Sequence, residues 1–153
     1  ILHYARTRSR STNVCAELVP TFDSFADEIW NSCRSQYKMI GCRDTETLNL
    51  LYGTEEKYLR LKIKKHNKTV GWAVALDTQM QSNKYFGSLR VGSIADCLGP
   101  LENAADIILA ITRYLQQRGV DLIISNQCHS AWSSALIRSS CGLARRVAIS
   151  LRM

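Results

Sequence analysis

The sequence predicts an α/β domain whose elements follow the order β-α-α-β-β-β-α-β-α-β. Two observations carry this prediction. Residues 58–65 alternate between apolar and polar side chains, which is typical of a half-buried strand, and a polar turn leads into a second such run. Further along, two amphipathic helices flank the short and nearly all-apolar stretch 121–125, as expected for a strand in the middle of a sheet.

The first elements are a strand over residues 14–19 and a helix that runs to about Tyr37. Either Thr21 or Asp23 provides a side-chain oxygen that can cap this helix. Apolar residues recur along the helix at steps of three and four, so they form one buried face: Phe22, Phe25, Ala26, Ile29, Trp30 and Cys33.

A short second helix and a hairpin follow. Asp44 caps the helix, which ends at Tyr52. The strand over residues 58–65 then turns at residues 66–68 into an antiparallel partner over residues 69–80. In this partner strand, four apolar residues are expected to share one face: Val70, Trp72, Val74 and Leu76.

A third strand of this group is expected between Tyr85 and Leu98. Gly87 and Gly92 lie inside it, and they indicate a β-bulge or a close backbone approach. A long helix over residues 102–117 comes next, with this inward face: Ala105, Ile108, Leu109, Thr112 and Leu115.

The last elements are the apolar strand over residues 121–125, a fourth helix and a final strand. The fourth helix spans residues 130–140 and ends at Gly142. Residues 146–152 alternate again and predict the final strand.

Length and composition indicate one globular domain. The 153 residues suit a single core, and 46% hydrophobic with 22% charged residues is ordinary for such a domain. Residues 1–13 are basic and aperiodic, so we interpret them as a tail or linker, and residues 14–153 as the domain. Since the chain does not begin with Met, it is consistent with a fragment of a longer protein, and a fusion to an N-terminal domain stays open.

The formal net charge of +7 predicts a surface that attracts anions. Its densest basic group alternates with apolar residues, which one face of a half-buried hairpin explains: Lys62, Lys64, Lys65 and Lys68. A phosphate-bearing cofactor also accounts for a moderate positive charge. Nucleic-acid binding rests on charge alone and is the weaker alternative.

The cysteines and histidines predict neither a metal site nor a disulfide framework. Six cysteines stand at wide, irregular spacings without a CxxC pair, and the three histidines lie far apart. A chain of this length can build its core without disulfides, so we expect free thiols in a reducing cytoplasm. No apolar run approaches the roughly 18 to 20 residues of a membrane span.

Three segments carry a resemblance to a known family. Asn126 begins a pattern of Asn, a small residue, a helix, and then Gly142 and Leu143. Arg118 and Gly119 precede the apolar strand, and residues 69–75 (TVGWAVA) place a glycine after an apolar residue in the hairpin. Over Val14 to Met153 the chain resembles the GNAT superfamily of acyltransferases and, more finely, the C-terminal domains of larger bacterial proteins.

The resemblance implies a mixed, mostly antiparallel central sheet with helices on both faces. It also implies acetyl-CoA or another acyl-CoA as co-substrate. The pantetheine arm would bind to backbone amides of the fourth strand. The pyrophosphate would bind at the N-terminus of the third helix, where free N–H groups favour negative charge. The corresponding binding residues are Ile94, Ala95, Cys97, Leu98, Gly99, Leu101, Asn103, Ala104 and Asn126.

The sequence departs from the family at two places. The pyrophosphate loop lacks its leading Arg or Gln and contains the acidic Glu102. Arg138 stands where many members have a tyrosine that protonates the departing thiolate.

The resemblance implies an N-acyltransferase in which a primary amine of a small molecule attacks the thioester directly. Asp77 and Asp96 are the candidate general bases near strand ends, and Glu28 is a weaker one. A nucleophilic Cys97 activated by His129 or Arg90 is a lesser alternative. A catalytically degenerate GNAT-fold module that binds a ligand or partner is the competing function, and a homodimer stays open.

Overall fold

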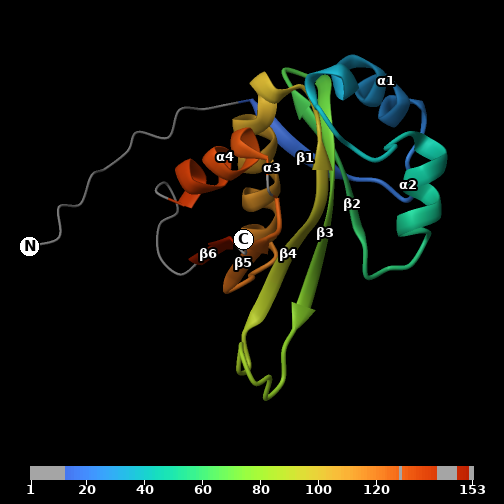
Figure 1. Cartoon of the computed structure of the whole chain (residues 1–153). Helices are drawn as coiled ribbons and strands as arrows, with labels where there is room; N and C mark the ends of the chain where they lie inside the picture. The colour runs from blue at the N-terminus through green and yellow to red at the C-terminus, as the bar shows by residue number, and fades with distance from the viewer. Residues whose placement is uncertain (1–12, 128, 141–147, 152–153) are drawn as a thin grey trace, which may run out of the picture.

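In the part of the chain that the structure describes, six strands form one sheet and lie side by side in chain order (Figure 1). The computed structural model describes residues 13–127, 129–140 and 148–151. The first four strands are antiparallel neighbours, whereas β5 runs parallel to β4 and β6 runs parallel to β5. The sheet is therefore mixed and mostly antiparallel, as predicted. The strands are β1 Val14–Leu18, β2 Leu59–Lys65, β3 Lys68–Gln79, β4 Arg90–Leu98, β5 Leu122–Ser125 and β6 Ala148–Leu151.

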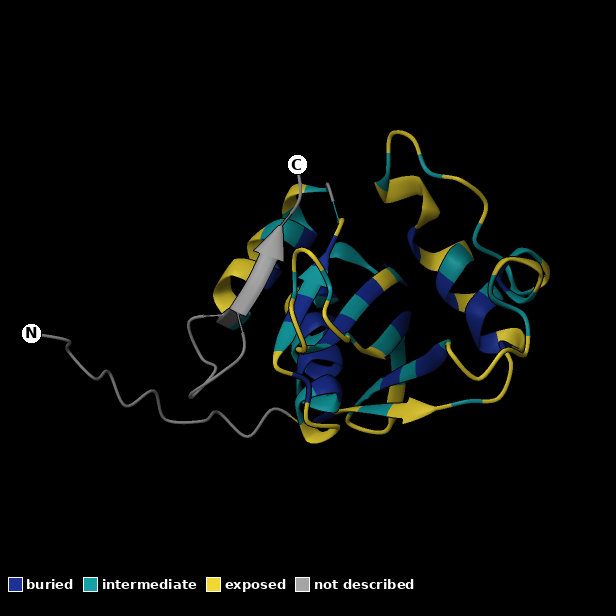
Figure 2. Ribbon diagram, turned by 90° about the horizontal axis from the view of Figure 1, so that it is seen from below, coloured by how far each residue is buried: buried dark blue, intermediate teal, exposed yellow. Residues whose placement is uncertain are grey.

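Helices cover both faces of the sheet, which confirms the predicted layers and element order. Helices α1 (Ser24–Cys33) and α2 (Thr45–Tyr52) lie on one side, while α3 (Ala104–Gln117) and α4 (Ser130–Ser140) lie on the other (Figure 1). Each side has its own core. Trp72, Val74 and Leu98 face α1 and α2, and Leu61, Ile94 and Ile123 face α3 and α4. Figure 2 shows the buried residues on the sheet and on the inner sides of the helices.

The local signals for helix starts and for the hairpin turn are confirmed. Asp23 Oδ1 accepts a hydrogen bond from the Phe25 amide at 3.1 Å, so Asp23 is the N-cap of α1. Asp44 Oδ1 accepts from the Thr47 amide at 2.8 Å and caps α2. His66 and Asn67 both have positive φ angles (48° and 65°), the conformation that a two-residue hairpin turn requires.

Several details of the predicted elements are wrong. Strand β4 begins at Arg90, so Gly87 lies in the turn before this strand and not inside it. Helix α1 ends at Cys33, and a 3₁₀ turn over Arg34–Gln36 leads to an extended Tyr37 (φ −109°, ψ 130°). Val70 packs in the α3 side core, because a bulge between the pairs Ile63↔Gly71 and Lys64↔Thr69 leaves it as the extra residue. Ala105 is exposed.

The packed face of α3 is rotated from the prediction because two glycines bring the helix close to the sheet. A Cβ on Gly71 or Gly99 would lie 2.5 Å from Ile107 Cδ1, so Ile107 occupies the space that both glycines leave. Ile107 and Ile111 are fully buried as a result, beside the predicted Ile108, Thr112 and Leu115, and the predicted Leu109 is partly buried against the same core.

Several predictions fall outside the described residues. These are the tail up to residue 12, Cys128, Cys141, the helix end at Gly142 and Leu143, and the outer parts of the final strand. None of the helices in the described part is long and apolar enough to cross a membrane.

Candidate functional site

Strand β4 continues beyond the end of β5, and this creates an open edge in the middle of the sheet. The two strands pair from Val91↔Leu122 to Ile94↔Ser125, and residues 95–98 have no partner on β5. A bulge accompanies the opening, since Asp96 pairs with Val74 and Ile94 with Ala75, leaving Ala95 unpaired between them. The backbone of this part of β4 is therefore available to a ligand on one side.

A cavity of about 200 Å³ lies at this opening. Three chain segments that are distant in sequence line it: the connection between α1 and α2, the end of β4, and the segment from β5 into α4. The lining residues are Tyr37, Met39, Ile40, Arg43, Asp96, Cys97, Leu98, Gln127, His129 and Trp132.

Asp96 is the carboxylate of this cavity, and three groups hold it in place. Its Oδ2 accepts from Arg43 Nε at 2.7 Å and from the Tyr52 hydroxyl at 3.0 Å. Its Oδ1 accepts from the Cys97 amide at 2.9 Å. Burial, together with the charge of Asp96, raises the pKa of Tyr52, so its phenol stays a hydrogen-bond donor. The Asp96 carboxylate is thus oriented and remains partly exposed to the cavity.

Tyr37 connects the two walls of the opening. Its hydroxyl donates to the Gly99 carbonyl oxygen at 3.2 Å and accepts from Trp132 Nε1 at 3.1 Å. Its ring meets the His129 ring edge-on, with 5.2 Å between the centroids. Burial raises the pKa of Tyr37 to about 12, so this phenol is protonated at neutral pH.

Cys97 is poorly placed to act as a nucleophile. Its side chain is buried, and burial together with the neighbouring Asp96 charge raises the pKa of the thiol well above its usual range. His129 lines the same cavity, but Arg90 lies at the opposite end of β4. A thiolate is therefore disfavoured where the sequence allowed one.

Asp77 lies away from the cavity, at the end of the sheet where α3 terminates. Its two oxygens accept from Arg90 Nε and Nη2, each at 2.7 Å, and from Arg118 Nε at 2.7 Å. These bonds lower the pKa of Asp77, with Arg90 as the main cause. The carboxylate is 5% exposed. It joins β3, β4 and the end of α3, and the structure does not bring it together with Asp96. Glu28 is exposed on α1.

The residues predicted to bind the cofactor lie in four different surroundings. Cys97 and Leu98 line the cavity, and Ala95 is exposed at the bulge beside it. Gly99, Leu101, Asn103 and Ala104 form the turn into α3, while Ile94 is a core residue. Asn126 is exposed directly after β5, and its neighbour Gln127 lines the cavity instead.

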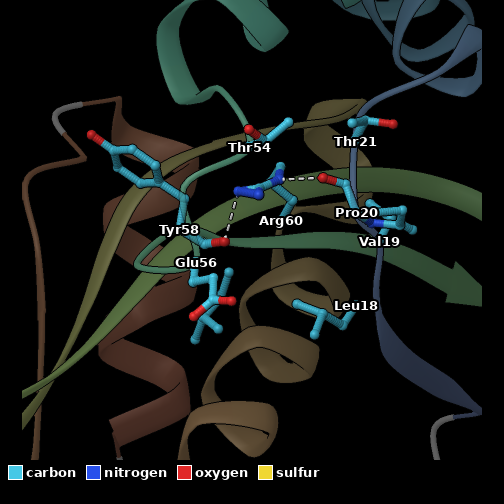
Figure 3. Close-up of a pocket in the computed structure, with 9 residues that line it drawn as sticks. Leu18, Val19, Pro20, Thr21, Thr54, Glu56, Tyr58 and Arg60 are labelled. Atoms are coloured by element: carbon cyan, nitrogen blue, oxygen red, sulfur yellow. Dashed lines mark hydrogen bonds between the residues drawn. The ribbon is translucent and has the colours of Figure 1, made fainter.

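A second cavity, of about 490 Å³, lies at the other edge of the sheet between the β1–α1 and α2–β2 connections (Figure 3). Its inner wall carries Arg60, which is only 5% exposed. The guanidinium donates to the carbonyl oxygens of Pro20, Glu55 and Tyr58 at 2.8 to 3.3 Å. Four of its five N–H groups are used in this way, so Arg60 joins the two connections rather than offering a site for an anion.

Other charged groups serve the scaffold. Lys64 pairs with Glu17, Lys65 with Asp106 at 2.6 Å, and Lys62 lies 4.3 Å above the Phe25 ring, which supports the half-buried hairpin as the source of the lysine cluster. Within the described residues, no group of three or more His, Cys, Asp or Glu could hold a metal ion.

Comparison with solved structures identifies the architecture. A ribosomal-protein-alanine N-acetyltransferase from Brucella melitensis biovar Abortus 2308 has a TM-score of 0.55 at 17% identity, over 92% of this chain and 99% of its own. The aminoglycoside N-acetyltransferase AAC(6')-Iy in complex with CoA has a TM-score of 0.52 at 14% identity, over 91% of this chain and 93% of its own. An aminoglycoside acetyltransferase from an uncultured soil metagenomic sample has a TM-score of 0.52 at 15% identity, over 89% of this chain and 93% of its own. The chain has the GNAT acyltransferase fold.

At these identities the likeness shows the GNAT fold alone. No protein-family model matches the chain, and no curated protein sequence matches it closely enough to count as a relative. A fold does not determine an activity, which depends on the residues of the site.

Sequence reasoning missed the residues that surround Asp96. The sequence predicts Tyr37 only as the end of a helix, and it predicts no role in a site for Arg43 or Tyr52. These side chains come from the helix side of the sheet, and no motif or spacing connects them to β4. The one available signal was the polar, irregular stretch between two capped helices, which is where binding residues commonly lie.

Proposed function

We propose that this protein is an acyl-CoA-dependent N-acyltransferase that transfers an acetyl or another acyl group to a primary amine of a small molecule. The observation that supports it best is the position of Asp96, an oriented carboxylate beside the open edge of β4. The neighbours with this fold include an enzyme in complex with CoA and a metagenomic enzyme in complex with sisomicin, which favours this reaction class and an amine acceptor.

The reaction needs little from the protein beyond a base and a backbone donor. Asp96 takes a proton from the attacking amine, directly or through one water molecule. The amine nitrogen forms the new amide bond to the carbonyl carbon, and the carbon–sulfur bond of the thioester breaks. The departing thiolate takes a proton from water, since Arg138 stands where the family often has a tyrosine. A β4 amide is suited to hold the oxyanion.

A non-catalytic binding module of the same fold is the second candidate. It is favoured by the ion pair between Arg43 and Asp96, which already occupies the carboxylate. The turn into α3 also carries Glu102 and lacks the usual Arg or Gln.

Two measurements distinguish these functions. Saturating acetyl-CoA should raise the melting temperature, because a ligand that binds only the folded state stabilises it. Thiol release with a panel of primary amines should then fall by roughly 10²- to 10⁴-fold in Asp96→Asn, the usual contribution of a general base. Glu46→Gln, an exposed change on α2, is the control and should leave the rate unaltered. Acetyl-CoA binding without any thiol release would favour the binding module.

A further inference from the structure

The connection between α1 and α2, residues 34–43, crosses the opening beside β4, and we call it the strap. Most of its side chains are exposed, and Met39 is 95% exposed. Three hydrogen bonds fix its first half: Gln36 Oε1 accepts from the Leu101 amide at 2.8 Å, and the Tyr37 hydroxyl bonds with Gly99 and Trp132. The strap therefore bridges from the turn before α3 to helix α4.

The Gln36 contact occupies a backbone donor that the fold offers to a phosphate. Leu101 is the first residue after Pro100, which has no N–H, and its amide lies at the N-terminal end of the helical segment that continues into α3. Such amides attract anions. Here Gln36 Oε1, a neutral amide oxygen, accepts the hydrogen bond of the Leu101 amide that a phosphate oxygen would otherwise accept.

The Tyr37 contact narrows the path between β4 and α4. The phenol spans from the Gly99 carbonyl to Trp132 Nε1, and its ring lies against His129. The cavity behind it measures about 200 Å³. Sites for ligands of drug size usually have about 300 to 1,000 Å³. A pantetheine arm with its pyrophosphate needs more room than this cavity offers.

We propose that the strap is a built-in competitor of acyl-CoA: it closes the crevice through Gln36 and Tyr37, and acyl-CoA binds only when the strap moves away. This inference rests on the proposed acyl-CoA site. The strap is suited to such movement because its held half depends on few bonds and little buried surface, the features of a segment that opens locally. The apparent affinity for acyl-CoA is then reduced by the fraction of molecules that are closed.

The test compares coenzyme A and acetyl-CoA binding by calorimetry in the full chain and in two strap variants. Gln36→Ala removes one hydrogen bond of the closed form and should tighten binding by about threefold. Tyr37→Phe removes two and should tighten it by about tenfold. Ser35→Ala, in the same exposed turn, and Tyr85→Phe, an exposed tyrosine of the β3–β4 hairpin, are the matched controls and should not change the affinity.

Hydrogen exchange gives an independent measurement of the strap. Coenzyme A should speed amide exchange over residues 34–43, although a bound ligand ordinarily slows exchange around its site. Thermal unfolding of each variant confirms that it is folded.

The possible outcomes separate the two proposals. Unchanged or weaker binding in both variants, or slower strap exchange with coenzyme A, overturns the strap as a competitor and leaves the acyltransferase proposal intact. Failure of the wild type and of every variant to bind either ligand overturns both proposals. Tighter binding with faster strap exchange supports both.

Discussion

Replacing Asp77 by Asn should destabilise the protein strongly for a single polar change near its surface. The substitution keeps the shape of the side chain but removes its charge. Arg90 and Arg118 then converge on an amide that has one oxygen instead of two, and one guanidinium contact is lost or turned into an unfavourable one.

The size of the effect follows from the geometry and exposure of the cluster. Three N–H···O distances of 2.7 Å are short, as expected for charge-assisted bonds, and each such bond contributes roughly 1.5 to 3 kcal/mol when buried. Both arginine side chains are 38% exposed, so water replaces part of what they lose. We expect a loss of about 2 kcal/mol in the free energy of unfolding, which lowers the melting temperature by roughly 4 to 8 °C in a chain of this size.

Urea unfolding at pH 7 measures this loss, with Glu55→Gln as the control. Glu55 pairs with Lys57 on the surface, where both side chains are more than half exposed, and its substitution should change little. A loss below about 0.5 kcal/mol for Asp77→Asn, within the range of ordinary surface substitutions, would refute the reasoning.

The pH dependence gives a second signature of the same cluster. The arginines lower the pKa of Asp77 in the folded state, so its stabilisation is present above the unfolded pKa of about 3.9 and is lost as the pH falls through the folded pKa. The urea midpoint of the wild type should therefore drop more steeply below about pH 4 than that of Asp77→Asn.

Two further predictions concern the scaffold around the site. Gly99→Ala should lower the free energy of unfolding by about 1 to 3 kcal/mol in a thermal melt, because the new Cβ would lie 2.5 Å from Ile107 Cδ1 and 2.7 Å from the Val70 carbonyl oxygen. Adding Ile107→Val removes only the first of these contacts and should not restore the stability. Full recovery in the double variant would show that the contact with the backbone oxygen is unimportant. Arg60→Met should lower the free energy of unfolding in urea by about 2 kcal/mol. The carbonyl oxygens that accept from Arg60 lose their donor, and they gain only partial access to water. An unchanged free energy would mean that the guanidinium does not join the two connections.

Most of the fold could be predicted because its signals are local. The caps at Asp23 and Asp44, the polar hairpin turn and the helix over residues 130–140 each depend on a few neighbouring residues. The errors arise where contacts between distant segments decide the geometry. The bulge that turns Val70 to the other face and the close glycine approach that rotates α3 are consequences of packing, which periodicity alone does not contain.

The candidate site was predictable only in the part formed by a strand end and a helix start. Asp96 and the end of β4 could be selected as candidates because the backbone N–H groups at a helix start are free to bind an anion. The separation of Asp96 from Asp77 could not be predicted, since both are acidic residues in or near strand ends and both pair with arginine. They differ in their surroundings, because Asp96 lines the cavity and Asp77 does not. Tyr37 was hidden for a related reason, because its bonds reach residues 62 and 95 positions away.

The strap also contacts the candidate base through Arg43, and this connects the two proposals. Gln36 and Tyr37 close the crevice at one end of the strap, while Arg43 at its other end holds Oδ2 of Asp96. The Tyr52 hydroxyl, from α2, also donates to Oδ2, and the Cys97 amide donates to Oδ1. The Asp96 carboxylate therefore keeps its orientation without Arg43. A displacement of the strap that extended to Arg43 would therefore open the crevice for acyl-CoA and release Asp96 for the amine in the same movement.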